Sequence, residues 1–410
     1  MRYRVIGLIL IAFVIFTVGC KKDNYDSEKP DINDSNDIGE DDETQVDSIE
    51  DKIKSMSLDD KIGQLMIIGF DGVNFNEEVL GFIEEFKIGG FILFARNIVD
   101  ENQTLKLLND IKKANSNNIP LFLSIDEEGG KVSRLPKSFV RLPEAMTIGD
   151  KNDKDISYRL GNILGERVKS LGFNIDFAPV LDINSNPKNP VIGKRAFGTT
   201  LEQVVSNGIE VMNGIKDVGV IPAVKHFPGH GDTSVDSHVN LPKVNKTIEE
   251  LKSFELIPFR EAIEKGVDIV MVAHILYPEI DGAYPATMSS VIIQEILRDD
   301  LGYDGVVISD DMTMGAIVEN YHLEDGVLSF LKSGGDIALV CHGKDNPRKV
   351  FDKIKNAVET GELSEEDIDM KTYRILKLKE TYELEDREIN SIDIKALNNE
   401  TKELIKKINR

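Results

Sequence analysis

The stretch DIVMVA at residues 268–273, the helical pattern at 291–301 and the stretch GVVIS at 305–309 decide the fold. Both short stretches are almost wholly apolar, as strands are when their sheet is covered on both faces. The segment between them carries apolar residues at the three- and four-residue spacing of a helix. This order predicts two parallel strands joined by a crossover helix.

The same alternation extends from residue 51 to residue 359. Short apolar runs bounded by Gly, Pro, Asn or Asp predict strands at 64–70, 89–94, 120–125, 174–178, 221–224, 268–273, 305–309 and 336–340. Helical patterns occupy 77–86, 102–114, 156–171, 201–218, 248–265, 291–301 and 347–359. These ranges make eight strands that alternate with helices over roughly 300 residues. This pattern favours an α/β fold, namely a TIM (β/α)8 barrel, over a doubly wound open sheet.

The composition narrows the class of protein. The 410 residues include 49 basic and 72 acidic side chains, which gives a net charge of −23, and 41% are hydrophobic, enough for a sizeable core. The acidity argues against nucleic acid as a partner, because binding to phosphates needs clustered Lys and Arg. Two cysteines, Cys20 and Cys341, cannot build a disulfide framework or a Cys-rich zinc site.

The N-terminus resembles an export signal. Two arginines precede an apolar run at 5–18, and the run leads to Cys20. A small residue before a lone cysteine is similar to a bacterial lipoprotein signal, in which the cysteine is acylated, although Thr17 stands where such signals usually carry Leu. We predict a lipoprotein-type signal peptide at 1–20, lipidation at Cys20, and an exported protein anchored to the outer face of the bacterial cell membrane. The alternative is a plain signal peptide or an uncleaved anchor.

An acidic segment follows this signal. Residues 21–51 contain 13 acidic and 3 basic side chains, a net charge of −10, with little to bury. We therefore predict a disordered linker there. A single catalytic barrel domain is expected at 52–385, and a charged helical tail at 386–410.

Polar residues gather directly after several predicted strands. In a barrel, the C-terminal ends of the strands converge on the face that carries the chemistry. Four of the 6 histidines also fall within residues 226–274, and packing gives no reason for such a cluster. The residues at the strand ends are Asp126, Asp182, Lys225, His226, His274, Asp310, Asp311 and His342. They predict an active site at this face.

Two kinds of chemistry could use these side chains. Metal-assisted hydrolysis in amidohydrolase-type barrels usually needs a His-x-His on the first strand, but residues 64–71 contain no histidine. The glycines of the loop at 225–238 suit a movable loop better than a rigid set of metal ligands. We therefore expect no metal and no cofactor. Glycoside hydrolysis needs one carboxylate at the anomeric carbon, a role that suits Asp310, and a second group that protonates the leaving oxygen.

Four segments together resemble glycoside hydrolase family 3. The stretch ILRDDLGYDGVVISDDMT at 296–313 looks like the signature of that family. The loop KHFPGHGDT at 225–233, which continues to Asp-Ser-His at 236–238, is similar to the bacterial β-N-acetylhexosaminidases of the family, the NagZ group. The stretches SIDEEGGKVSR at 124–134 and GKRAFG at 193–198 agree with it in order and spacing.

The resemblance implies a role for each matching residue. Asp310 corresponds to the nucleophile that forms a glycosyl-enzyme intermediate. Asp236 and His238 correspond to a dyad in which the aspartate orients the histidine, which acts as general acid and then as general base. The residues that match positions holding the hydroxyls of a terminal N-acetylglucosamine are Asp126, Arg134, Arg195, Lys225 and His226. Histidine suits acid–base work because its ordinary pKa lies near the working pH.

Two neighbouring pairs remain as alternatives. Successive strand residues point to opposite sides, so one of Asp310 and Asp311 faces the site and the other makes a cap or loop hydrogen bond. Within the loop, His230 and Asp232 are a rival acid–base pair, to which we assign a loop-shaping role.

The resemblance implies an exo-acting, retaining β-N-acetylhexosaminidase that removes terminal N-acetylglucosamine from peptidoglycan fragments or related glycans. We expect a small carbohydrate as substrate, attachment to the membrane through the lipid anchor, and a monomer. The alternatives are a family 3 β-glucosidase or β-xylosidase, whose acid–base residue typically comes from a second domain, and a lipid-anchored sugar-binding protein. Chitin oligosaccharides as substrates, and phosphorolysis in place of hydrolysis, also remain open.

Overall fold

The computed structural model describes residues 48–116, 118–237 and 240–410. The predicted signal peptide with Cys20, residues 21–47 of the predicted linker, and His238 lie outside the described residues.

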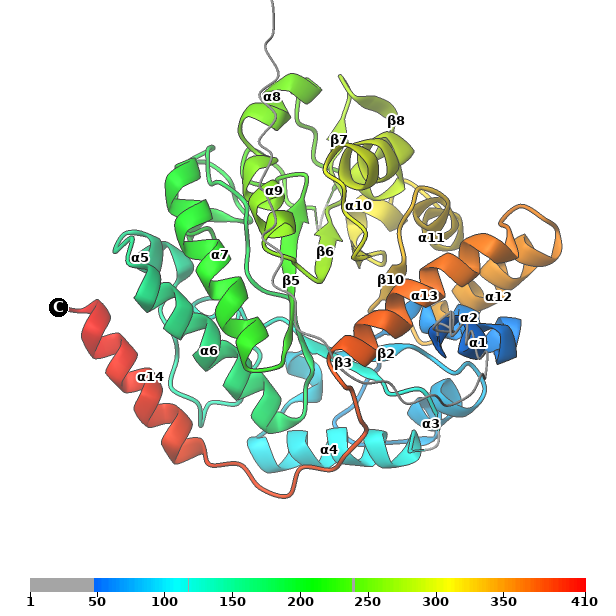
Figure 1. The fold of residues 1–410 in the computed structure, drawn as a ribbon, viewed down its shortest axis with the longest axis horizontal. Coiled ribbons are helices and arrows are strands. Elements are labelled where there is room, and N and C mark those ends of the chain that lie inside the picture. The colour runs from blue at the N-terminus through cyan, green and yellow to red at the C-terminus, as the bar shows by residue number, and fades with distance from the viewer. Residues whose placement is uncertain (1–47, 117, 238–239) are drawn as a thin grey trace, which may run out of the picture. The chain divides into compact units, whose positions relative to one another are not determined.

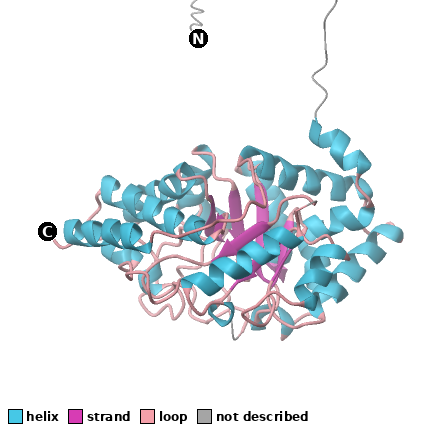
Figure 2. Cartoon of the chain, turned by 90° about the horizontal axis from the view of Figure 1, so that it is seen from below, coloured by secondary structure: helices cyan, strands magenta, loops and turns pink. Residues whose placement is uncertain are grey.

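Eight parallel strands close into a barrel, which confirms the predicted fold. Their order around the ring is β1-β10-β9-β6-β5-β4-β3-β2. The strands are β1 (Met66–Ile68), β2 (Gly90–Leu93), β3 (Phe122–Ile125), β4 (Ile175–Asp176), β5 (Ile221–Phe227), β6 (Ile269–Val272), β9 (Val306–Asp311) and β10 (Ile337–Val340). Pairing of β1 with β10 closes the ring. Figures 1 and 2 show the strands enclosed by helices, the arrangement of a TIM barrel.

Helices cover the outside of the barrel, and most of them share one hydrophobic core with it. They are α1 (Ser48–Ser55), α2 (Leu58–Gln64), α3 (Glu77–Glu84), α4 (Glu101–Ala114), α5 (Ala145–Gly149), α6 (Lys154–Leu171), α7 (Leu201–Asp217), α8 (Ile248–Ser253), α9 (Ile257–Glu264), α10 (Gly315–Val318), α11 (Leu323–Lys332), α12 (Asn346–Glu359), α13 (Glu365–Thr381), α14 (Ile394–Ile408) and the π-helix η4 (Val291–Asp300). Ser57, Thr247 and Ser364 begin α2, α8 and α13 with capping boxes, which satisfy backbone N–H groups that the helices leave open. No helix of the described residues is long and apolar enough to span a membrane.

Several elements differ from the predicted boundaries. Strand β5 continues to Phe227, past the predicted end at 224, because Phe227 still pairs with Val272 on β6. The predicted helix at 248–265 is two helices, since Pro258 in the first turn of α9 has no amide hydrogen with which α8 could continue. A short antiparallel pair, β7 (Leu276–Tyr277) and β8 (Asp281–Pro285), was not predicted. These strands are too short to show a clear alternation of apolar and polar residues.

Both ends of the described chain pack on the barrel. Residues 48–51, which the sequence assigns to the linker, form part of α1, and Ile49 and Ile53 are buried against Leu376 of α13. The C-terminal helix α14 lies beside α6 (Figure 1). There the guanidinium of Arg167 donates to the hydroxyl of Thr401 over 2.7 Å. The helical body therefore extends from Ser48 through α14.

Candidate active site

A cavity of about 360 Å³ opens at the C-terminal ends of the barrel strands. Asp126 follows β3, and Asp310 lies near the end of β9. Lys225 and His226 are among the last three residues of β5. Two further residues come from loops, Arg134 after β3 and Arg195 in a short 3-10 helix at Gly193–Arg195. The fold thus brings six of the eight residues predicted for catalysis and sugar binding into one cavity, namely Asp126, Arg134, Arg195, Lys225, His226 and Asp310.

Lys225 lies at the bottom of this cavity, with only 2% of its side chain exposed. Its ammonium is 2.7 Å from Oδ1 of Asp126 and 2.8 Å from Oε1 of Glu128. Burial by itself would lower the pKa of Lys225, but the two carboxylates outweigh burial and raise that pKa. Lys225 therefore enters the cavity as a fixed positive charge.

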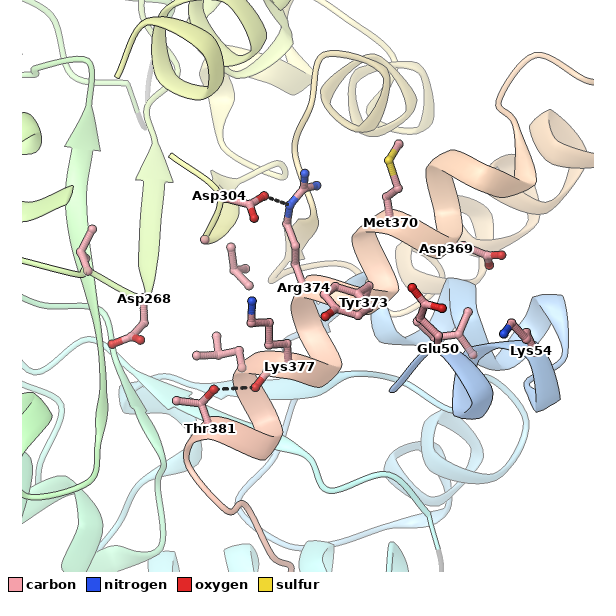
Figure 3. Close-up of a pocket in the computed structure, with 15 residues that line it drawn as sticks. Glu50, Lys54, Asp268, Asp304, Asp369, Met370, Tyr373, Arg374, Lys377 and Thr381 are labelled. Carbon is pink, nitrogen blue, oxygen red and sulfur yellow. Dashed lines mark hydrogen bonds and ion pairs between the residues drawn. The ribbon is translucent and has the colours of Figure 1, made fainter. Parts of the chain in front are cut away.

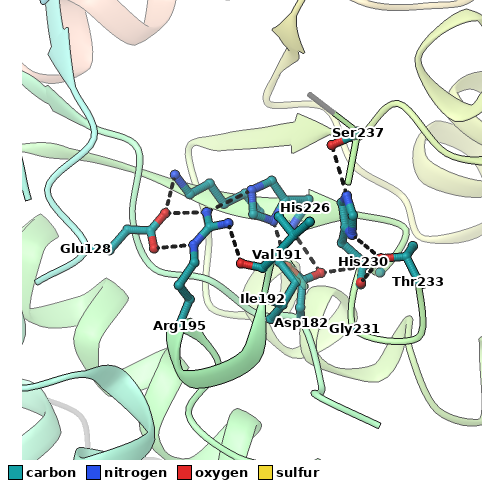
Figure 4. Close-up of polar contacts among 12 residues, drawn as sticks. Glu128, Asp182, Val191, Ile192, Arg195, His226, His230, Gly231, Thr233 and Ser237 are labelled. Atoms are coloured by element: carbon teal, nitrogen blue, oxygen red, sulfur yellow. Dashed lines mark hydrogen bonds and ion pairs between the residues drawn. The ribbon is translucent and has the colours of Figure 1, made fainter. Parts of the chain in front are cut away.

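Arg195 shares the carboxylate of Glu128 with Lys225 (Figure 4). Its Nε donates to Oε2 over 2.8 Å, and its Nη2 donates to Oε1 over 2.6 Å. Burial opposes ionisation of Glu128, yet the two cations hold its pKa well below the ordinary value. The sequence interpretation missed Glu128. The available signal was its place in the acidic triplet 126–128, which is followed by two glycines. The sequence does not show which of these acidic side chains faces the cavity.

His226 is oriented by Asp182, which lies behind it and is fully buried. Nδ1 of His226 is 2.6 Å from Oδ2 of Asp182, while Oδ1 accepts the backbone N–H groups of His226 and His230. Burial would raise the pKa of Asp182, but His226 and these N–H donors lower it, so the carboxylate is ionised. An ionised carboxylate only accepts, so Nδ1 carries the proton and Nε2 faces Arg195, 3.4 Å from Nη2. Asp182 thus acts through His226.

His230 also lines the cavity, but its ring bonds to the loop that follows it (Figure 4). Nδ1 lies 2.7 Å from the hydroxyl of Thr233, and Nε2 lies 3.2 Å from the hydroxyl of Ser237. Burial and the neighbouring His226 lower the pKa of His230 to about 4, so the ring is neutral near pH 7. Its predicted rival partner Asp232 pairs instead with Lys246, 3.1 Å away. This geometry favours the loop-shaping role.

The two aspartates at the end of β9 have different surroundings. Asp311 accepts from the backbone N–H and the hydroxyl of Thr313, at 2.9 and 2.6 Å, and from the backbone N–H of Cys341 at 3.1 Å. It therefore holds the turn after the strand. Asp310 is half-buried in the cavity wall, and its Oδ1 accepts the backbone N–H of Asp311 over 2.8 Å. Both residues line the cavity, and Asp310 is the one whose side chain does not bond to Thr313.

The proposed acid–base loop is described up to Ser237. Asp236 is half-buried on this loop and is not one of the residues that line the cavity. Ser237 is buried and lines the cavity. Its hydroxyl contacts His230, and its carbonyl accepts the N–H of Ala316 on α10 over 3.1 Å. The chain is thus fixed at the residue between Asp236 and His238, the latter outside the described residues.

Arg134 lines the cavity, and one of its side-chain donors lacks a partner within the described part of the chain. Its Nε is buried and has no hydrogen-bond partner among the described residues. Its backbone N–H donates to the buried carboxyl of Glu127 over 2.9 Å, which fixes the loop. A buried donor without a partner costs free energy.

The other strand-end histidines do not share one role. His274 is fully buried, with Nδ1 2.6 Å from the hydroxyl of Thr287 and Nε2 2.9 Å from the carbonyl of Asp311. It packs behind the site rather than facing the cavity as its position predicts, because its ring nitrogens bond to Thr287 and to the backbone of Asp311. His342 is exposed at the mouth, and its ring stacks at 5.4 Å on Phe94. Among the described residues, no three His, Cys, Asp or Glu side chains are arranged to hold a metal ion.

A larger cavity, of about 610 Å³, lies at the opposite end of the barrel (Figure 3). Its walls come from α1, from α13 and from the residues that precede β6 and β9. Arg374 there pairs with Asp304 at 3.1 Å, and Lys377 faces the same space. In TIM barrels the N-terminal ends of the strands serve stability and not chemistry. Size alone would thus select the wrong cavity.

Comparisons with known proteins identify the family of the chain. Residues 57–378 match the family model described as the glycosyl hydrolase family 3 N terminal domain. Beta-hexosaminidase A of Pseudoalteromonas piscicida is 35% identical over 327 residues, which cover 74% of this chain and 55% of that protein. A beta-hexosaminidase of Thiobacillus denitrificans is 37% identical over 273 residues, with 65% of this chain and 75% of that protein covered.

A solved structure is similar over most of the barrel. It is a glycoside hydrolase family 3 β-N-acetylglucosaminidase from a Paenibacillus species, 39% identical, with a TM-score of 0.81. The match covers 85% of this chain and 68% of that one. The chain thus spans little more than half of one relative and about two thirds of another. The family match includes the barrel strands and the segments at 124–134, 193–198, 225–238 and 296–313, and the chain belongs to glycosyl hydrolase family 3.

Proposed function

We propose that the chain is an exo-acting, retaining β-N-acetylhexosaminidase that releases terminal N-acetylglucosamine through a covalent intermediate on Asp310. The observation that carries this proposal is the single cavity that holds Asp310 together with five residues at the sugar-binding positions of the family. Its volume of about 360 Å³ suits one sugar ring. The names of the similar proteins, beta-hexosaminidase and β-N-acetylglucosaminidase, support the same activity.

The reaction proceeds in two steps in this proposal. The carboxylate of Asp310 attacks the anomeric carbon while the glycosidic C–O bond breaks, and His238, oriented by Asp236, gives its proton to the leaving oxygen. A water molecule then attacks the anomeric carbon and gives a proton to the same histidine, which frees Asp310. Two inversions give overall retention.

The remaining residues hold the sugar. Lys225, with its ammonium fixed between two carboxylates, is a donor suited to sugar hydroxyls, and Arg134 lines the same cavity. The carboxylate of Asp126, which pairs with Lys225, supplies acceptor oxygens. Nε2 of His226 is directed by Asp182 and forms part of the same surface.

The test is the release of p-nitrophenol from p-nitrophenyl N-acetyl-β-glucosaminide, with the product followed by NMR. We expect the β-anomer of N-acetylglucosamine to appear first. Tight sugar binding without release would favour the sugar-binding protein, and faster turnover of the glucoside or xyloside would favour the other family 3 activities. Formation of a sugar 1-phosphate when inorganic phosphate is added would show phosphorolysis.

The acid–base assignment has its own test. His238→Ala should lower turnover of the aryl N-acetylglucosaminide strongly, while His230→Ala should retain more of it. The reverse order would make His230 the acid–base residue.

We also propose that the protein is exported and anchored through Cys20, and that it acts as a monomer on peptidoglycan fragments. The sequence pattern at 1–20 supports the anchor. A Cys20→Ala variant should appear in the soluble fraction and incorporate no labelled fatty acid. Digestion of cell-wall fragments and of chitin oligosaccharides, with the released sugar identified by mass, separates the two substrate classes.

A further inference from the structure

Glu128 connects the two cations of the cavity. Both of its oxygens are engaged, since Oε1 lies 2.8 Å from Nζ of Lys225 and 2.6 Å from Nη2 of Arg195, while Oε2 accepts Nε of Arg195 at 2.8 Å (Figure 4). Only 5% of its side chain is exposed. A carboxylate committed in this way has little capacity left for substrate, and it controls where two other side chains point.

We propose that Glu128 is a positioning residue that fixes Arg195 and Lys225 in the orientation that binds the sugar, and that it thereby sets substrate affinity. The proposal rests on the proposed function, in which both cations hold sugar hydroxyls. In this proposal Glu128 acts only through Arg195 and Lys225, and it neither donates a proton to the substrate nor attacks it.

The geometry of each cation supports this role. Glu128 holds the Nε side of the Arg195 guanidinium in a two-point contact, which fixes the plane of the group and the direction of its remaining N–H bonds. Lys225 has three N–H donors, and Asp126 and Glu128 occupy two of them. The direction of the third follows from those two contacts. Without Glu128, Lys225 would keep one carboxylate and could rotate about it.

The charges lead to the same conclusion. Arg195 and Lys225 repel each other, and that repulsion acts to lower the pKa of Lys225. Glu128 lies between them and opposes that effect, because its negative charge contacts both cations. The two positive groups can therefore stay close together inside a buried cavity.

The backbone keeps this carboxylate in place. The N–H of Glu128 donates to the carbonyl of Val132 over 3.0 Å, which closes a tight turn. Gly129 and Gly130 in that turn have φ of 82° and 53°, the left-handed region that favours glycine. A Cβ on Gly130 would also lie 2.7 Å from the Cα of Glu144. The turn therefore fixes the backbone position from which the side chain of Glu128 reaches Arg195 and Lys225.

The barrel offers a matched control at its other end. Asp336 is also fully buried and also bridges two cations, with Oδ2 at 2.6 Å from Arg298 and Oδ1 at 3.2 Å from Arg374. It precedes β10, and its partner Arg374 lines the cavity at the opposite end of the barrel. Asp336→Asn therefore removes the same kind of charge without touching the sugar site.

The experiment compares Glu128→Gln with Asp336→Asn in the full chain, with p-nitrophenyl N-acetyl-β-glucosaminide as substrate. We expect Glu128→Gln to raise KM about tenfold to a hundredfold, the range for loss of a charge-assisted hydrogen bond, with a smaller change in kcat. Asp336→Asn should leave KM at the wild-type value. Glu128→Asp, which keeps the charge but shortens its reach, should give an intermediate KM even if the Gln variant does not fold.

Three results would overturn the proposal. They are a wild-type KM in the Glu128 variants, an equal rise of KM in Asp336→Asn, or a loss confined to kcat. Calorimetric titration with N-acetylglucosamine measures the same change in affinity without turnover. If the wild-type protein released no p-nitrophenol, the proposed function would fail, whereas the titration would still decide the role of Glu128.

Discussion

Replacement of His230 by glutamine should change how the stability of the protein depends on pH. His230 is 1% exposed, and burial, together with His226, lowers its pKa from 6.5 to about 4. Asp182 and Asp310 act in the opposite direction without cancelling this effect. Glutamine has a similar length and can reach Ser237, but it does not titrate, so the variant isolates the proton.

The sign follows from the protons bound in each state. In the unfolded chain the imidazole takes up a proton near pH 6.5, whereas in the folded protein it does so only near pH 4. Between these values the unfolded state binds more protons, so the free energy of unfolding falls as the pH falls. A pKa difference of about 2.5 corresponds to a loss of about 3 kcal/mol by pH 4. Well above pH 6.5 the ring is unprotonated in both states, and the group contributes no slope.

Urea unfolding followed by circular dichroism measures this effect, since the sequence contains no tryptophan for fluorescence. Wild type and His230→Gln are compared at several pH values between about 4.5 and 7.5. We expect the wild type to lose stability more steeply than the variant on acidification, by about 2 to 3 kcal/mol over this range. His322→Gln, at an exposed position, controls for removal of a histidine. Parallel curves for wild type and His230→Gln would refute the reasoning, because they would show that the ring is protonated equally in both states.

Four further changes test the site and its support. Asp310→Asn should lower kcat about a thousandfold or more for the aryl N-acetylglucosaminide, with an unchanged dichroism spectrum, and a variant with near wild-type kcat would exclude Asp310 as nucleophile. Ser237→Ala removes the contact to His230 and should lower kcat/KM about tenfold for a substrate with a poor leaving group. It should change kcat/KM little for a dinitrophenyl glycoside, whose leaving group needs no proton. Equal losses for both substrates would contradict a role of Ser237 in positioning His238. Asp336→Ala leaves the buried Arg298 without its partner and should cost about 3 to 5 kcal/mol in urea unfolding, while a loss below 1 kcal/mol would show that water replaces the pair. A chelator should leave turnover unchanged, and a loss that zinc restores would contradict the mechanism.

The local pattern of the sequence was enough to predict the barrel. All eight predicted strands are present, because buried parallel strands are continuous apolar runs and their ends carry turn residues. Boundaries were less well predicted where pairing with a neighbour decides them, as at Phe227, whose partner Val272 lies on another strand. The residues at strand ends were also predictable, because parallel strands all present their C-terminal ends on one face.

Only the tertiary structure decided which charged groups work together. Glu128 contacts Arg195 across 67 residues of chain, and Asp126 contacts Lys225 across 99. The sequence shows Glu127 and Glu128 as equal neighbours, yet one holds a loop and the other holds two cations. The physical reason is that a buried charge is stable only with a partner of opposite sign, and the partners come from distant segments that barrel closure brings together. The sequence by itself determined the barrel, its catalytic face and the family, and folding determined which side chains on that face hold one another in place.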